Sequence, residues 1–274
     1  MSIRLVALDL DGTLLDSQKN LPERNRKVLE ECIARGIYIV PCTGRTAYGI
    51  PESVMSIPGI RYAITVNGGM IEDIQEHRIL DTRFLDVSIA LEIMEMVQEY
   101  HVMYDAYVEG HGVVESRFLN HMDDYRIPPA IQELVRSTRQ VVPDTMEYLA
   151  RRKGTVQKVN LFFSDLDERK AVRQMLMKRD DILVSSAISN NLEINAIGAA
   201  KGEALMRLAS LLGVKKDETM ACGDGENDHS MIQMAGIGVV MDNGEPSLKA
   251  VADYITASND ESGVAQAIEK LVLL

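Results

Sequence analysis

Short apolar runs alternate with amphipathic segments in the first part of the chain. The apolar runs are residues 3–8, 37–42 and 62–66. Continuous apolar character is typical of strands buried on both faces of a parallel sheet. Residues 22–35 carry an apolar stripe at helical spacing, with Pro22 at the start and Gly36 just past the end. This rhythm predicts a doubly wound α/β sheet.

The rhythm changes in the middle of the chain and later resumes. The pattern predicts helices at residues 87–100 and 167–178, and strands at residues 102–108 and 156–163. We expect this block to be an inserted α+β domain with a sheet of its own. A helix at residues 201–212 and a strand at residues 218–222 then restore the first rhythm.

Composition narrows the class of protein. The chain has 274 residues, 46% hydrophobic and 26% charged, which suits a soluble globular protein of two domains. Its net charge of −12 disfavours a nucleic acid or an anionic membrane as partner. The three cysteines show no zinc or disulfide spacing, and no apolar run approaches the ~18 residues of a membrane helix. We expect a cytoplasmic protein without nucleic-acid or membrane partners.

Polar residues follow the ends of the predicted strands. They are Asp9, Asp11, Thr43, Asn67, Asp224, Asn227 and Asp228, and Lys201 opens the helix before the last of these strands. Ligands of open α/β sheets bind outside the carboxyl ends of the strands. If these strands share one parallel sheet, the polar side chains converge on one edge.

This set of side chains suits the hydrolysis of a phosphate ester. A carboxylate that attacks a dianionic phosphate needs a cation, and Mg²⁺ is held by a few carboxylates. Asp9 and Asp224 are candidate ligands, together with a backbone carbonyl near Asp11. Lys201 can neutralise further charge, and Thr43 with the following N–H groups can hold phosphate oxygens.

The two acids of the first motif suit different roles. Attack by Asp9 would form an aspartyl phosphate. Asp11 can protonate the leaving group and then activate water. Taken alone, two acids in Asp9-Leu10-Asp11 are more often part of a turn. Their joint occurrence with the other polar groups at strand ends favours a catalytic role for both acids.

Four segments resemble, in order, the motifs of the haloacid dehalogenase-like superfamily, and most closely its Cof-type phosphatases of subclass IIB. They are Asp9-Leu10-Asp11-Gly12-Thr13-Leu14-Leu15, Thr43-Gly44-Arg45, Lys201-Gly202 and Gly223-Asp224-Gly225-Glu226-Asn227-Asp228. The resemblance spans the chain. It implies an α/β fold whose core, residues 1–83 and 191–274, is a Rossmann-like, doubly wound parallel sheet. Residues 84–190 would form an inserted α+β cap domain that sets substrate specificity.

The resemblance also implies roles for individual residues. Asp9 would be the nucleophile and Asp11 the general acid and base. The implied ligands of Mg²⁺ are Asp9, Asp11 through its carbonyl, Asp224 and, close behind it, Asp228. The implied phosphate contacts are Leu10, Thr43, Gly44, Lys201 and Asn227, with substrate contacts at Arg45 and Asn67. The expected substrates are sugar phosphates and other small phosphorylated metabolites, and the expected state is a monomer or homodimer.

Two other functions fit parts of the pattern. A phosphotransferase or mutase could use the same scaffold. A phospho-receiver or ligand-sensing module also combines acids, a Thr, a Lys and Mg²⁺ on a doubly wound sheet. Receivers are about half this length. They also carry the phosphorylated Asp after a later strand.

A polar cluster in the middle block bears on specificity. Asp105, Tyr107, Glu109 and His111 surround a predicted strand end. Alternating positions of this strand could face a substrate, or the strand could be an exposed edge followed by a turn.

Overall fold

The structure is a computed structural model that describes residues 2–152 and 154–274. The chain forms two compact units, one from Met1–Thr82 with Gly198–Leu274 and the other from Arg83–Ile197. The chain therefore leaves the first unit after Thr82 and returns to it at Gly198. The second unit runs past residue 190, where we expected the cap to end, because β13 (Asn191–Ala196) pairs within its sheet.

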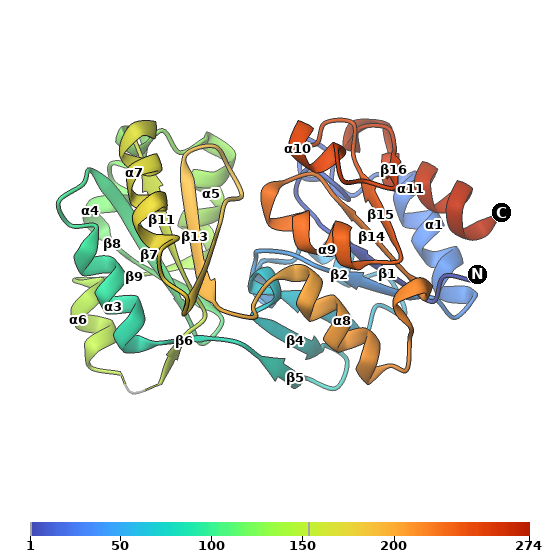
Figure 1. The fold of residues 1–274 in the computed structure, drawn as a ribbon, viewed down its shortest axis with the longest axis horizontal. Coiled ribbons are helices and arrows are strands. Elements are labelled where there is room, and N and C mark those ends of the chain that lie inside the picture. The colour runs from blue at the N-terminus through green and yellow to red at the C-terminus, as the bar shows by residue number, and fades with distance from the viewer. Residues whose placement is uncertain (1, 153) are drawn as a thin grey trace. The chain divides into compact units, whose positions relative to one another are not determined.

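A parallel sheet forms the centre of the first unit, in the strand order β16-β15-β14-β1-β2 (Figure 1). Its strands are β1 (Leu5–Leu8), β2 (Tyr38–Pro41), β14 (Thr219–Gly223), β15 (Ile237–Val240) and β16 (Tyr254–Ile255). Its longer helices are α1 (Glu23–Ala34), α8 (Lys201–Leu211), α9 (His229–Met234) and α11 (Gly263–Ile268). Shorter elements are η1 (Ala47–Gly49), α2 (Glu52–Met55), η4 (Lys216–Glu218), η5 (Glu226–Asp228), α10 (Pro246–Lys249), η6 (Asn259–Glu261) and the π-helix η7 (Glu269–Leu273).

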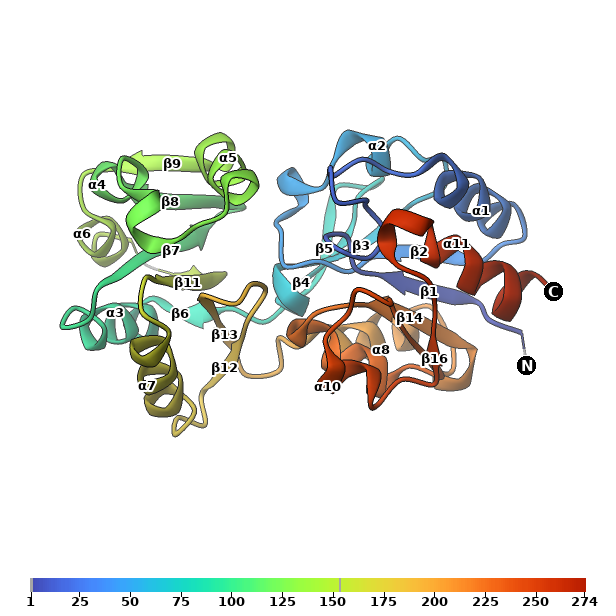
Figure 2. The same ribbon diagram turned by 90° about the horizontal axis from the view of Figure 1, so that it is seen from above.

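Both faces of this sheet are covered. Val6 and Leu8 of β1 belong to one apolar cluster, which contains residues of α1 and α11. Leu5 and Ala7 belong to another, which contains residues of α8 and α9. Figure 2 shows α1 and α11 on one side of β1, and α8 on the other. Burial of both faces explains why β1 is apolar throughout, and the predicted doubly wound α/β class is confirmed.

The third predicted strand differs from our expectation. β3 (Tyr62–Thr65) pairs antiparallel with β4 (Met70–Asp73), which pairs with β5 (Arg78–Thr82). β3 contacts β2 through an isolated parallel bridge between Cys42 and Ile64. The expectation that β3 is a regular strand of the parallel sheet was wrong, because the chain reverses directly after it in η2 (Val66–Gly68).

The second unit contains a largely antiparallel sheet in the order β12-β13-β11-β7-β8-β9, in which β8 and β9 are parallel. Its strands are β7 (Val102–Val108), β8 (His111–Glu115), β9 (Arg139–Val142), β11 (Lys158–Phe163), β12 (Ile182–Ser185) and β13, with a separate pair of β6 (Leu85–Asp86) and β10 (Thr155–Val156). Its helices are α3 (Val87–Met96), α4 (Ser116–Leu119), η3 (Met122–Tyr125), α5 (Pro129–Thr138), α6 (Thr145–Ala150) and α7 (Leu166–Leu176). Among the described residues, the helices are all too short or too polar to cross a membrane.

Candidate active site

The ends of β1 and β14 bring two acids to one edge of the parallel sheet. Leu8 and Cys222 are register partners on the two neighbouring strands. The N–H of Asp9 continues this pairing by donating to the carbonyl of Cys222 at 3.0 Å. Because the strands run parallel, Asp9 and Asp224 leave the sheet at the same edge, as predicted from their positions in the sequence.

A third acid completes a cluster of carboxylates. One oxygen each from Asp9, Asp224 and Asp228 lies within 4.8 Å of the others. Asp228 is held by the N–H groups of Asp224 and Gly225, which donate to its Oδ2 at 2.9 and 3.0 Å. Three negative groups so close together repel one another unless a cation is present. An oxygen-only donor set of this kind fits Mg²⁺.

Lys201 occupies the interior of this cluster. Its side chain is 0% exposed, and Nζ donates to Oδ1 of Asp9 and to Oδ1 of Asp228, each at 2.6 Å. Burial alone would lower the pKa of Lys201, but the charges of Asp228 and Asp9 outweigh burial and raise it. Lys201 is therefore a fixed cation, placed by the first turn of α8.

Two of these acids, Asp9 and Asp224, have a pKa above that of an ordinary aspartate. Burial raises the pKa of Asp9 well above its usual value, Lys201 opposes this shift, and Asp228 and Asp224 add to it. Burial and the charge of Asp228 raise the pKa of Asp224 to about 7, although the Thr13 hydroxyl donates to its Oδ1 at 2.7 Å. The metal-free site thus holds an excess of negative charge that a divalent cation would relieve.

These shifts predict a pH-dependent stability. Between 3.8, the ordinary value, and about 7, the folded metal-free protein binds more protons at Asp224 than the unfolded chain does. Its free energy of unfolding should therefore fall as pH rises from about 5 to 8, by roughly 1–2 kcal/mol. Urea titrations in EDTA measure this slope. Asp224→Asn should flatten it, and Mg²⁺ should restore stability at pH 8. A stability that rises over this range would contradict the prediction.

Asp11 lies apart from the three clustered carboxylates. Arg45 donates from Nε and Nη2 to the two carboxylate oxygens of Asp11, each at 2.7 Å, and Lys19 lies 2.7 Å from Oδ1. Burial raises the pKa of Asp11, but Arg45 and then Lys19 outweigh burial and lower it to about 2. In this arrangement Asp11 is ionised and has no proton to donate.

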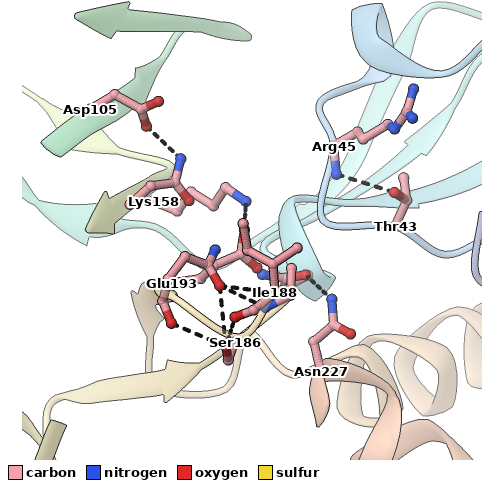
Figure 3. Close-up of polar contacts among 12 residues, drawn as sticks. Thr43, Arg45, Asp105, Lys158, Ser186, Ile188, Glu193 and Asn227 are labelled. Atoms are coloured by element: carbon pink, nitrogen blue, oxygen red, sulfur yellow. Dashed lines mark hydrogen bonds and ion pairs between the residues drawn. The ribbon is translucent and has the colours of Figure 1, made fainter. Parts of the chain in front are cut away.

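The ends of β2 and β3 are bonded to each other and to the motif that contains Asp224. The carbonyl of Thr43 accepts the N–H of Asn67 at 3.0 Å, and the Thr43 hydroxyl accepts the N–H of Arg45 at 3.2 Å (Figure 3). Asn227 donates its amide to Oδ1 of Asn67 at 3.2 Å. Val66 and Asn67 both have positive φ, which is rare for a β-branched residue such as Val66. This strained turn places Asn67 beside Asn227.

The other predicted residues lie in the same loops. The side chain of Leu10 is fully buried in the core, so Leu10 can contact a ligand only through its backbone. Gly44 lies in the turn between Thr43 and Arg45. Thr13 and Lys19 were not predicted as site residues. Thr13 stands within the first motif, but no sequence signal distinguished Lys19 from an ordinary surface lysine.

Gly12 makes the close approach of the first and fourth motifs possible. Its φ is +86°, and a Cβ at this position would lie 2.4 Å from Oδ2 of Asp224. Gly36 has a similar φ of +80°, with nothing within 4 Å of its Cβ position. The two glycines therefore share the backbone requirement and differ in what a side chain would meet.

Gly12→Ala should displace the Asp224 carboxylate. If the three carboxylates hold Mg²⁺, the Mg²⁺ concentration that gives half of the maximal stabilisation of the folded protein should rise by roughly 10-fold or more, as for other disturbed metal sites. Gly36→Ala should lose stability from its backbone strain while keeping the Mg²⁺ dependence of the wild type. Equal Mg²⁺ titration curves for the two variants would show that Gly12 does not position Asp224.

Comparison with known proteins agrees with this geometry. The family model for haloacid dehalogenase-like hydrolases matches residues 6–268. The 5-amino-6-(5-phospho-D-ribitylamino)uracil phosphatase YcsE of Bacillus subtilis is 30% identical over 100% of this chain and 97% of its own. The pyridoxal phosphate phosphatase YbhA of Escherichia coli is 27% identical over 98% of both chains. A solved haloacid dehalogenase-like hydrolase from B. subtilis has a TM-score of 0.86 at 27% identity, over 98% of this chain and 100% of its own.

The chain belongs to the haloacid dehalogenase-like hydrolase family. Within that family it is a phosphatase that hydrolyses phosphate monoesters of small metabolites. The resemblance inferred from the four motifs is confirmed.

Proposed function

We propose that this phosphatase is Mg²⁺-dependent and works through an aspartyl phosphate, with Asp9 as nucleophile and Asp11 as general acid and base. The observation that carries the proposal is the buried Lys201 between Asp9 and Asp228, next to Asp224. Burying an ammonium group and two carboxylates next to a third, half-buried carboxylate is costly. A function that needs concentrated charge at one sheet edge accounts for it.

The chain's own groups divide the first half of the reaction between them. Lys201 bonds Oδ1 of Asp9 and orients the carboxylate, so we assign the attack on phosphorus to Oδ2. The bond from phosphorus to Asp9 forms as the bond to the ester oxygen breaks. Asp11 gives its proton to that oxygen, which leaves as an alcohol. The Thr43 hydroxyl, the Asn227 amide and the N–H groups of Leu10 and Gly44 hold the phosphate oxygens.

Hydrolysis of the aspartyl phosphate reverses the role of Asp11. Asp11 takes a proton from a water molecule as that water attacks phosphorus, and the bond from phosphorus to Asp9 breaks. Inorganic phosphate leaves and the Asp9 carboxylate is restored. Arg45 and Lys19 keep Asp11 ionised in the present arrangement, so Asp11 becomes an acid only after leaving these partners and taking up a proton.

The carboxylate cluster would hold Mg²⁺ through Asp9, Asp224 and the Asp11 carbonyl, with Asp228 behind them. When bound, Mg²⁺ supplies the positive charge that allows an anionic nucleophile to approach an anionic phosphate.

The names of two relatives support sugar phosphates and related small phosphate esters as substrates. One named relative hydrolyses a phosphate on a ribityl chain and another hydrolyses pyridoxal phosphate, both small organic phosphates.

The second unit has a sheet and core of its own, separate from the catalytic residues. We assign substrate specificity to this unit, residues 83–197, as a cap domain.

Phosphate release from a panel of sugar phosphates, sugar alcohol phosphates and a chromogenic aryl phosphate tests the function. We expect turnover with Mg²⁺ and none in EDTA, with activity regained on adding Mg²⁺. Product analysis should show inorganic phosphate and the free alcohol. Isomerised sugar phosphate without released phosphate would contradict hydrolysis and favour a mutase.

A further inference from the structure

Arg207 on α8 joins that helix to three other points on the chain. Its Nη1 donates to the carbonyl of Gly198 at 2.9 Å, and its Nη2 donates to the carbonyl of Gly68 at 3.1 Å. Its Nε lies 2.7 Å from Oδ2 of Asp81 on β5. α8 packs against β4, the neighbour of β5 (Figure 1), and all four residues belong to the first unit.

Arginine is the side chain that suits this junction. Its planar guanidinium group presents N–H donors in fixed directions, so one side chain can bond two carbonyls and a carboxylate at once. The junction is largely shielded from water, because the side chains of Arg207 and Asp81 are 24% and 23% exposed. The ammonium group of a lysine is a single point and cannot span the same three partners.

One of the three points lies in the strained turn that carries Asn67. Val66 and Asn67 both have positive φ, and this turn reverses the chain after β3. On one side, the N–H of Val66 donates to the carbonyl of Arg45 at 2.9 Å. On the side of α8, Arg207 holds the turn through the carbonyl of Gly68. Arg207 therefore supplies a support for this turn that its own backbone geometry does not favour.

A second point lies just before Lys201. α8 begins at Lys201 without a side-chain cap from Ala200. A Cβ on Gly68 would lie 2.5 Å from the carbonyl oxygen of Ala200, so the turn of Asn67 packs directly on the segment that leads into α8. The bond from Arg207 to the Gly198 carbonyl holds this segment from the second turn of the same helix. Arg207 thus fixes the turn and the start of α8 together.

We propose that Arg207 is a positioning residue for phosphate binding. The turn places Asn67 beside Asn227, whose amide donates one N–H to Oδ1 of Asn67 at 3.2 Å. This bond orients the amide, so that its second N–H can bond a phosphate oxygen. Arg207 holds the turn against the start of α8 and acts on phosphate through Asn67 and Asn227. The inference rests on the proposed function, which assigns a phosphate contact to Asn227.

Arg207→Met tests the inference, with Arg4→Met as a matched control. Arg4 lies in the same unit and has the same kinds of partner. It donates to the carbonyl of Gly213 at 2.9 Å and to the carboxylate of Glu218 at 3.3 Å, neither of which is a site residue. Both variants lose one charge and its bonds, so both should be less stable to urea than the wild type. Only Arg207→Met should also change phosphate binding.

The measured quantity is the dissociation constant of inorganic phosphate in the presence of Mg²⁺, by isothermal titration calorimetry. It should rise roughly 10-fold in Arg207→Met and stay at the wild-type value in Arg4→Met. KM for an aryl phosphate should rise by the same factor. Its kcat should change by less than about 3-fold, because Asp9 and Lys201 keep their partners. Equal phosphate affinities in the two variants would overturn the inference.

Arg207→Lys separates charge from position. Lysine keeps a positive charge near Asp81 but cannot bridge the carbonyls of Gly68 and Gly198. It should therefore recover much of the stability that Arg207→Met loses and keep the weakened phosphate binding. Full recovery of phosphate affinity in Arg207→Lys would show that charge alone matters, and would contradict the positioning role.

Amide hydrogen exchange of the free protein tests the turn without phosphate or turnover. The N–H of Asn67 donates to the carbonyl of Thr43, and that of Gly69 to the carbonyl of Val66, each at 3.0 Å. Both amides should exchange roughly 10-fold faster in Arg207→Met than in the wild type or in Arg4→Met. Unchanged exchange at both amides would refute the inference.

These measurements are distinct from the test of the reaction mechanism. Undiminished turnover in Asp9→Asn would refute the aspartyl phosphate, and phosphate affinity with amide exchange in Arg207→Met would still decide the role of Arg207.

Discussion

Asp9→Asn is expected to lower kcat for phosphate release by roughly 10⁴-fold or more, because a neutral amide cannot attack phosphorus and form the acyl phosphate. The same substitution should slightly stabilise the metal-free protein. It removes one of three crowded carboxylates, and Lys201 keeps its bond to Asp228 at 2.6 Å. Activity and stability should therefore change in opposite directions. Initial rates at saturating substrate and Mg²⁺, with urea titrations in EDTA, measure the two effects.

The matched control is Asp217→Asn, an exposed aspartate in η4 of the same unit. It should keep the kcat and stability of the wild type. Acid-quenched reactions should trap a phosphoprotein in the wild type and in Asp217→Asn, but none in Asp9→Asn. Undiminished turnover in Asp9→Asn would refute the nucleophile assignment.

Lys201→Met should be the most destabilising single change at the site. Methionine fills a similar volume, but it leaves Asp9 and Asp228 buried without their shared cation. We expect the free energy of unfolding at pH 8 to fall by about 3–5 kcal/mol, the usual cost of breaking a buried ion pair from one side. Activity should fall by more than roughly 100-fold, because the Asp9 carboxylate loses the donor that orients it.

The pH dependence of the lost stability shows whether missing charge or missing packing causes it. Burial already raises the pKa of Asp9, and removing Lys201 removes the charge that opposes this shift. The folded variant therefore takes up protons that the unfolded chain does not, and its stability should recover as pH falls from about 8 to 5. Lys216→Met, at an exposed lysine, should have little effect at either pH. A loss in Lys201→Met that is the same at both pH values would show that packing, not charge, is responsible.

Much of the site at the edge of the parallel sheet could be predicted, because its residues stand in recognisable local sequence patterns. Asp9 directly follows a strand that is apolar throughout, and Asp224 follows another, so a parallel sheet brings both to one edge whatever the details of packing. Lys201 at the first position of α8 opposes the helix dipole, and this mismatch indicated a special role. The structure brings Lys201 to Asp9 and Asp228.

Other features depend on contacts that the local sequence pattern does not specify. Lys19 pairs with Asp11 across a loop, and nothing in its neighbours marks it. β3 has the apolar run of a buried strand, yet the reversal at Val66–Gly68 pairs it with β4. Lys158 and Asn160 interrupt an otherwise apolar strand, but their partners Glu193 and Asp105 lie on two other strands. Register between strands is a tertiary property, so the pattern of a single strand does not reveal which side chains on neighbouring strands meet.

The sequence by itself determined the family, the α/β class and the order of the acids along the chain. These features depend on patterns of neighbouring residues, which indicate buried strands and the turns that follow them. Only the tertiary structure decided which charges meet. Lys201 lies between Asp9 and Asp228, Arg45 holds Asp11, and Lys158 on β11 bonds Glu193 on β13. The physical reason is that electrostatic and hydrogen-bonding energies depend on distances of a few ångströms between side chains that are far apart in the sequence, such as Lys201 and Asp9, which are 192 positions apart.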